Sequence, residues 1–176
     1  MSNFSISSLF PFRRVKIDGF DQIVDSDKGT AIFTTVSPDE RYTPICYKCS
    51  SKASGLHDYN QRTLRDLSIG NNPGFIIYNY RKITCPKCGR TRVEDLGIID
   101  DPNGPRVTKR MANYIHDLCC LMPIDQVAKH FKLDWKTVKE IDKTFLEEKF
   151  GETDYTNSGY LAIDEVSTGK YHKYMT

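Results

Sequence analysis

The spacing of apolar and polar positions changes once along the chain. Before residue 100, short runs such as 15–17 and 30–36 alternate between apolar and polar side chains, and residues 75–83 form a longer apolar stretch. Such runs predict β-strands, because successive side chains of a strand point to opposite faces. After residue 105 the apolar positions recur every three or four residues, which predicts helices. We therefore expect an α+β protein with its strands first and its helices second.

Clusters of turn-forming residues divide these runs. Residues 25–29, Asp-Ser-Asp-Lys-Gly, lie between the first two runs and predict a β-hairpin, and residues 70–74 predict a turn before the strand at 75–83. Residues 100–105, Asp-Asp-Pro-Asn-Gly-Pro, interrupt regular structure and predict a linker. The expected division is a hairpin and ribbon domain over residues 1–100 and a helical domain over residues 106–150.

Three helices are expected in the second domain, over residues 106–121, 124–132 and 134–150. Asp134 is a good N-cap for the third helix. The apolar residues of the second and third helices fall on one face of each and are expected to point inward: Ile124, Val127, Ala128, Phe131, Trp135, Val138, Ile141 and Phe145. The short connection gives the layout of a helix-turn-helix, whose second helix enters the major groove of DNA. Any three-helix bundle shares this pattern, so it does not identify DNA binding by itself.

Two cysteine pairs, Cys46-Tyr-Lys-Cys49 and Cys85-Pro-Lys-Cys88, are the most informative motif. A C-x-x-C turn holds two thiolates around one metal ion, and two such turns complete a tetrahedral site. Four sulfur ligands leave no position for water or substrate, so we expect a structural Zn²⁺ that holds a β-ribbon together. A disulfide or redox role is the alternative, and it fits two separated pairs poorly.

Other cysteine and histidine residues are weaker candidates for metal binding. His57 could replace a cysteine as a ligand, but four cysteines are already present. Cys119 and Cys120 lie within the first expected helix, where neighbouring positions face different ways, so we expect them to pack in the core. His116 and His130 are expected at the surface or its boundary.

Basic residues gather between residues 62 and 92, where Asp66 is the one opposing acid. They are Arg62, Arg65, Arg81, Lys82, Lys87, Arg90 and Arg92. A zinc-stapled ribbon with this charge suits the phosphate backbone of double-stranded DNA, as does a stripe on the third helix formed by Lys136, Lys139 and Lys143. A solvated surface would tolerate the same charges. For the interleaved tyrosines we favour core packing over base stacking: Tyr59, Tyr78 and Tyr80.

Composition places the chain among soluble proteins. Of its 176 residues, 39% are hydrophobic and 27% are charged, and the net charge is +2. The sequence has no apolar run near the roughly 20 residues of a membrane span and no recognisable secretory signal. Close cysteine pairs without an export signal indicate reduced thiols, so we expect a cytoplasmic protein without a membrane partner.

Near the C-terminal end, residues 159–166 form an apolar strand-like run that carries Asp164 and Glu165. Successive strand side chains face opposite ways, so only one of the two acids can share a site with partners elsewhere. A carboxylate suits Mg²⁺, and two-metal phosphoryl transfer would need further carboxylates. Taken alone, both residues could equally be surface acids.

Four segments in this order resemble the N-terminal part of DDE transposases of the ISL-three insertion-sequence family. They are residues 46–49 with 57–67, residues 80–88, residues 106–115 with 124–146, and residues 161–174. The resemblance implies that the ribbon and the helices bind the terminal inverted repeats of the element. It also implies that Asp164 is the first acid of a catalytic triad and that residues 158–176 begin an RNase H-like catalytic domain.

The sequence departs from the family pattern in two ways. Ser50 replaces the glycine that usually follows the first cysteine pair, and the later Asp and Glu of the triad are absent from these residues. We therefore expect a DNA-binding fragment that is not an enzyme as it stands, with Mg²⁺ needed only by a complete catalytic domain. The alternatives are a stand-alone zinc-ribbon and helix-turn-helix regulator, an inhibitor that pairs with itself or with a full-length transposase, and a decayed remnant.

Overall fold

The fold is described from a computed structural model, which covers residues 10–25, 29–151, 156, 159–160, 166–169 and 173–175. Its contacts divide the chain into two units, Met1–Lys143 and Thr144–Thr176. The first unit contains a five-stranded sheet and most of the helical region, and the second contains a small hairpin. Among the described residues, no helix combines the length and apolar character that a membrane crossing requires.

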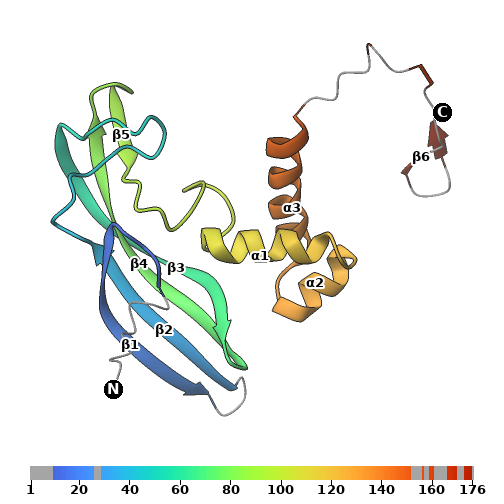
Figure 1. Cartoon of the computed structure of the whole chain (residues 1–176), viewed down its shortest axis with the longest axis horizontal. Coiled ribbons are helices and arrows are strands. Elements are labelled where there is room, and N and C mark those ends of the chain that lie inside the picture. Colours follow the sequence, from blue (N-terminus) through green and yellow to red (C-terminus); the bar gives the residue numbers. More distant parts are fainter. Residues whose placement is uncertain are drawn as a thin grey trace. The chain divides into compact units, whose positions relative to one another are not determined.

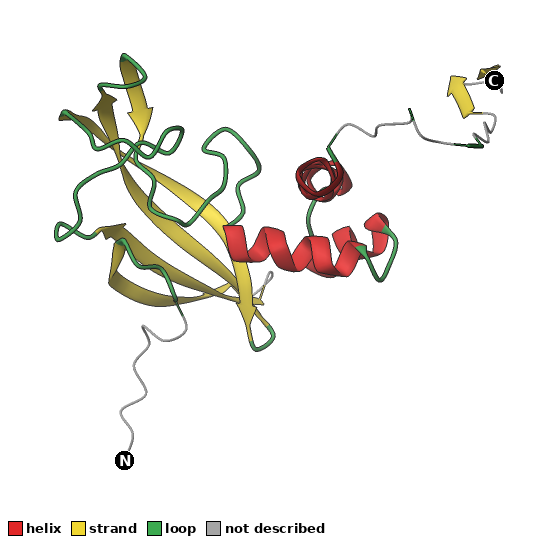
Figure 2. Cartoon of the chain, turned by 45° about the horizontal axis from the view of Figure 1, so that its top comes forward, coloured by secondary structure: helices red, strands yellow, loops and turns green. Residues whose placement is uncertain are grey.

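One twisted sheet contains both the N-terminal hairpin and the ribbon (Figure 1, Figure 2). Its strands are β1 (Val15–Asp25), β2 (Gly29–Pro38), β3 (Gly55–Ile69), β4 (Asn72–Cys85) and β5 (Arg90–Val93). The expected hairpin is confirmed as the antiparallel pair β1–β2. Strand β2 then lies parallel to β4, which also pairs antiparallel with β3 and β5. This parallel contact, which the sequence did not predict, joins the hairpin and the ribbon into a single sheet.

Strand β3 is the long element that the sequence did not predict. Its first half, residues 57–63, is largely polar and exposed, so it shows no period-two pattern of apolar residues. The strand forms because its backbone pairs with β4 along most of its length. Gly74 is needed where the two strands meet after the turn, since a Cβ at this position would lie 2.2 Å from the carbonyl oxygen of Leu67.

The core of the sheet lies on one of its faces and is built from all parts of the first hundred residues. It contains Phe10, Val36, Leu64, Ile76, Tyr78, Tyr80, Leu96 and Ile98. Tyr78 and Tyr80 stack with their ring centroids 5.1 Å apart, which confirms the expectation that they pack in the core. The same expectation is wrong for Tyr59, which is 67% exposed on β3.

The three expected helices are present as α1 (Lys109–Cys119), α2 (Ile124–Phe131) and α3 (Trp135–Phe150). Lys132 ends α2 in the left-handed region, with φ +54°, and its backbone N–H donates to carbonyls of the last turn. Asp134 accepts a hydrogen bond from the Lys136 N–H at 2.8 Å, which is the expected capping contact. Val127, Ala128, Phe131, Val138 and Ile141 are buried as expected.

Trp135 does not point into the helical core as its spacing suggested. It is 51% exposed at the first position of α3. The core positions of this helix are Val138 and Ile141, three and six residues further on. At the start of a helix a side chain has no preceding turn to pack against, so apolar spacing alone does not fix its direction.

Helix α1 is attached to the edge of the sheet by a buried carboxylate. Asp66 of β3 accepts hydrogen bonds from the Thr108 hydroxyl at 2.6 Å and from Nε of Arg110 at 2.8 Å. The backbone of Arg65 also exchanges hydrogen bonds with Arg106 and Thr108, at 2.8 and 2.9 Å. The residues that follow the expected linker therefore continue the sheet edge before α1 begins.

The second unit contains a short antiparallel hairpin of β6 (Val166–Gly169) and β7 (Lys173–Met175). Asp164 and Glu165 lie outside the described residues, as does most of the strand expected over residues 159–166. The RNase H-like fold implied for this region is therefore still a prediction.

Candidate metal centre and nucleic-acid interface

Two tight turns of matching geometry hold the four cysteines. In the first, the Ser50 N–H donates to the Cys46 carbonyl at 2.8 Å, and in the second the Gly89 N–H donates to the Cys85 carbonyl at 3.0 Å. The Cys88 N–H also donates to the sulfur of Cys85 at 3.3 Å. Each turn directs its two thiols toward the other turn, although they are 36 residues or more apart in sequence.

The four sulfur atoms fit one tetrahedral metal ion. They all lie within 4.8 Å of one another. The Cys49–Cys85, Cys49–Cys88 and Cys46–Cys88 sulfur distances are 3.4, 3.6 and 3.9 Å. Tetrahedral Zn–S bonds of about 2.3 Å place their sulfurs about 3.8 Å apart. The predicted cluster of four cysteines is confirmed, and it includes no other residue of the described part of the chain.

The thiols of the cluster differ in acidity. Hydrogen bonds from the side chain and backbone of Ser51 lower the pKa of Cys49 to about 6. Hydrogen bonding with Cys49 and Cys85 raises the pKa of Cys88 to about 11. A metal needs thiolates, so Cys88 would have to lose its proton for zinc to bind.

A backbone contact joins the first cysteine turn to the end of β5. Cys46 forms a β-bridge with Glu94, and the Tyr47 and Asp95 N–H groups donate to the carbonyls of Val93 and Ile45 at 3.2 and 2.8 Å. These contacts place the two cysteine turns side by side. One half of the metal site is therefore the turn between β4 and β5, and the other half is a turn that backbone hydrogen bonds attach to the end of β5.

Arg81 is part of the fold and not of a DNA-binding surface, which corrects the prediction made for it. Its Nε and Nη2 atoms donate to both carboxylate oxygens of Glu94 at 2.5 and 2.6 Å. The two side chains are 8% and 0% exposed. A buried guanidinium that is paired in this way has no access to a phosphate.

Arg62 and Arg65 are also engaged by the protein itself. The Arg62 guanidinium donates to the Pro102 carbonyl and lies 5.4 Å from the centroid of the Tyr80 ring. Arg65 donates to the Asp66 and Gly74 carbonyls, both at 2.7 Å, and lies 5.1 Å from the Phe75 ring. Arg62 therefore joins the sheet to the segment after β5, and Arg65 joins β3 to the start of β4. Both arginines keep part of their surface in solvent.

The other predicted basic residues form two separate sets, in which Lys82 and Arg92 are half-buried and the others are exposed. The ribbon set surrounds β5 and consists of Lys82, Lys87, Arg90 and Arg92. The helix set lies along α3 and consists of Lys136, Lys139 and Lys143, all of which are exposed. Both sets have the charge that a phosphate backbone requires. Their DNA contacts are still a prediction.

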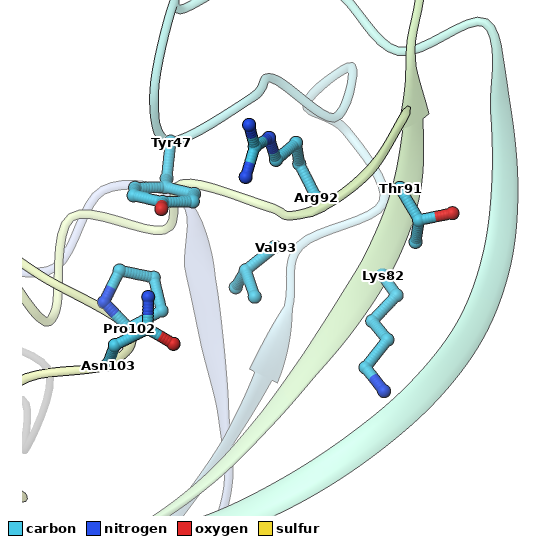
Figure 3. Close-up of a pocket in the computed structure, with 7 residues that line it drawn as sticks. All are labelled: Tyr47, Lys82, Thr91, Arg92, Val93, Pro102 and Asn103. Carbon is cyan, nitrogen blue, oxygen red and sulfur yellow. The ribbon is translucent and has the colours of Figure 1, made fainter. Parts of the chain in front are cut away.

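A pocket of about 290 Å³ opens beside the ribbon set (Figure 3). Its lining residues come from three segments: Tyr47 from the first cysteine turn, Lys82, Thr91, Arg92 and Val93 from β4 and β5, and Pro102 and Asn103. Sequence reasoning predicted Lys82 and Arg92 but missed the others. Tyr47 stands inside a cysteine pair, and Asn103 lies in a segment that the turn residues marked only as a linker, so neither gave a signal of its own.

The fold and the site define a protein with a four-cysteine zinc ribbon followed by three helices. A family model described as the zinc-finger of transposase IS204/IS1001/IS1096/IS1165 matches residues 43–95. The chain is also 31% identical over 150 residues to the transposase for insertion sequence element IS1001 of Bordetella parapertussis. These two findings confirm the resemblance to ISL3-family transposases that the sequence motifs indicated.

The second match covers 85% of this chain and 36% of the relative. The chain thus spans about a third of the length of that transposase, and the transposase activity is that of the relative. No solved structure matches the chain.

Proposed function

We propose that this chain uses a zinc-dependent ribbon and a helix-turn-helix to bind double-stranded DNA, and that its specific targets are the terminal inverted repeats of an insertion sequence. The observation that carries the proposal is the four-cysteine cluster, whose two turns hold β4 and β5 together beneath the ribbon set of basic residues. The matches to a transposase zinc-finger and to a transposase support the choice of DNA as the partner.

The geometry of α2 and α3 supports major-groove recognition. The link between them comprises Lys132, Leu133 and Asp134, and the left-handed Lys132 turns the chain sharply. Lys136 and Lys139 are exposed in the first two turns of α3, the part of a recognition helix that approaches base edges. The exposed Trp135 adds an apolar surface at the same end, which suits contact with a thymine methyl group.

The proposal assigns no chemistry to the four-cysteine zinc, because its coordination is complete. Asp164 is proposed as a carboxylate of a separate catalytic centre, on the basis of the family resemblance alone. Strand cleavage and transfer are therefore not part of the function proposed for these residues.

The proposal is tested by measuring DNA affinity against salt concentration with the sequence ends that flank the gene. We expect Lys136→Ala and Lys139→Ala each to weaken binding and to reduce the slope of log K against log salt by about one. Lys16→Ala, which removes an exposed lysine of β1, is the matched control and leaves the slope unchanged. Equal affinity for the flanking ends and for a shuffled duplex would refute specific recognition, and unchanged slopes would refute the role of α3.

A further inference from the structure

The pocket beside the ribbon combines groups that recognise different parts of one nucleotide. Lys82 and Arg92 provide positive charge, Thr91 and Asn103 provide hydrogen-bonding groups, and Tyr47, Val93 and Pro102 provide apolar surface. Its volume, about 290 Å³, lies just below the roughly 300–1,000 Å³ of small-ligand sites. A volume of this size is comparable with that of one nucleotide unit.

The walls of the pocket are held in place before any ligand arrives. The Pro102 carbonyl accepts a hydrogen bond from Arg62, and the Asp101 carboxylate accepts one from the Asn103 N–H at 2.9 Å. On the opposite wall, Lys82 and Val93 are cross-strand partners of β4 and β5. A preformed site loses less conformational entropy on binding than a site that must be ordered.

Nearby groups offset the charges of the two pocket cations to different extents. The cross-strand neighbour of Lys82 on β3 is Asp58, whose carboxylate interacts electrostatically with Lys82 and accepts hydrogen bonds from the Tyr59 N–H and the Asn60 amide, both at 2.8 Å. The Nε atom of Arg92 is buried and has no hydrogen-bond partner among the described residues. Arg92 is therefore the cation of the pocket with a donor left for an anionic ligand.

The pocket is also coupled to the metal site. Tyr47 stands between the ligands Cys46 and Cys49, and Arg92 lies close enough to the Cys88 thiol to lower its pKa. In Figure 3 the Tyr47 ring lies above Pro102 and Asn103, with Arg92 beside it. Zinc bound to these cysteines would therefore hold in place the turn that carries the aromatic wall.

We propose that this pocket receives a single unstacked nucleotide of the bound DNA, with its base against Tyr47 and Pro102 and its phosphate beside Arg92. The inference rests on the proposed function, since it concerns the same DNA complex. It goes beyond that function in assigning the ribbon a preference for DNA with an unpaired nucleotide. Stacking of a base on an aromatic side chain is sequence-tolerant, so this contact recognises distorted DNA rather than a base sequence.

The experiment compares two duplexes of mixed sequence that differ only in one unpaired nucleotide, each bound by the full zinc-loaded chain. We expect the bulged duplex to bind about tenfold more tightly than the paired duplex. Tyr47→Ala and Asn103→Ala are expected to abolish this preference and to retain binding of the paired duplex. Tyr47→Phe, which keeps the ring, should keep the preference, as should Lys87→Ala, which removes a ribbon charge that does not line the pocket.

The outcomes separate the inference from the proposed function. Equal binding of both duplexes by the unaltered chain, or a preference that survives Tyr47→Ala, would refute the nucleotide pocket while leaving duplex binding intact. Absence of binding to either duplex would refute both. We expect a deoxynucleoside monophosphate to compete with the bulged duplex for the pocket and equimolar inorganic phosphate not to compete. Equal competition by the two compounds would show that the pocket binds anions without recognising a base, and it would overturn the assignment. The zinc content of every variant is measured, so that a loss of the preference caused by a damaged metal site is recognised. Asn103→Ala changes the wall of the pocket that contains no zinc-binding cysteine, so its effect does not pass through the metal site.

Discussion

At the scale of single residues, the pair formed by Arg81 and Glu94 shows how charge can serve the fold. Glu94 forms the β-bridge with Cys46 and also neutralises Arg81, so it lies between the sheet and the metal site. The Glu94 hydrogen bonds raise the pKa of Arg81, which keeps the guanidinium charged. A buried ion pair of this kind contributes little compared with apolar packing, but the loss of one partner leaves an unpaired buried charge.

We predict that Glu94→Gln destabilises the zinc-loaded protein by about 3–5 kcal/mol, because Arg81 stays buried without its counter-ion. The double variant Arg81→Met with Glu94→Leu should cost less than this single change. Urea unfolding followed by circular dichroism measures both values. The control is Asp125→Asn, which removes the solvent-screened pair with Lys129 and should cost much less than Glu94→Gln. A Glu94→Gln variant as stable as this control would contradict the account.

The residues that follow the two cysteine turns occupy the same left-handed backbone conformation. Ser50 has φ +56° and Gly89 has φ +64°. Glycine adopts this conformation without a steric penalty, whereas a residue with a Cβ loses about 1 kcal/mol there. We predict that Ser50→Gly stabilises the protein by up to about 1 kcal/mol and that Gly89→Ser destabilises it by a similar amount. Thermal unfolding of the zinc-loaded variants measures the change in Tm for each substitution. Changes of the same sign would show that the two positions do not have the same backbone requirement.

At the scale of elements, the sequence predicted those strands and helices whose apolar residues are periodic. It placed the β1–β2 hairpin, β4 and all three helices, because each buries one regular face. It missed β3, whose exposed polar half gives no such pattern and whose strand conformation depends on pairing with β4. The parallel contact of β2 with β4 depends likewise on residues 42 positions apart, such as Ile32 and Gly74, which no local pattern encodes.

The same distinction explains how much of the site could be predicted. The four ligands were found because cysteine chemistry and a C-x-x-C spacing are local properties. The structural roles of the arginines could not be predicted in this way. Arg62, Arg65 and Arg81 are distinguished by the groups that the fold places beside them, which are distant in sequence. The density of basic residues along a sequence does not distinguish side chains that reach solvent from side chains that form hydrogen bonds within the sheet.

The attachment of α1 to β3 through Asp66 leads to a third prediction. We expect Asp66→Asn to destabilise the protein by about 3 kcal/mol, since Arg110 would lose its buried counter-ion. Amide hydrogen exchange should become faster in α1 than in β4, because the lost contact is the one that holds the start of this helix. Asp100→Asn removes the exposed pair with Lys109 and is the matched control. Equal exchange of α1 amides in both variants would show that Asp66 does not hold the helix.

At the scale of the whole molecule, the zinc site and the helices contribute to one proposed surface for DNA in different ways. The cluster holds β4, β5 and the first cysteine turn together and thereby positions the ribbon set and the pocket. The helix set depends on the packing of Val127, Phe131, Val138 and Ile141 and on no metal ligand. Removal of zinc should therefore affect one part of the DNA interface more than the other.

We predict that Cys88→Ser lowers the zinc content well below one ion per chain and weakens DNA binding. Serine is a poor zinc ligand, so the second cysteine turn loses its attachment to the first. Cys119→Ser is the matched control, because this cysteine lies on α1 outside the four-cysteine cluster. Metal analysis by mass spectrometry and DNA binding are measured on the same preparations.

The most direct test of the central claim is the salt dependence of DNA binding by the unaltered chain before and after zinc is removed with a chelator. We expect the metal-free chain to bind at least about tenfold more weakly, with a shallower salt slope, and added Zn²⁺ to restore both values. A metal-free chain with the same affinity and the same slope would contradict the claim that zinc holds the DNA-binding surface together.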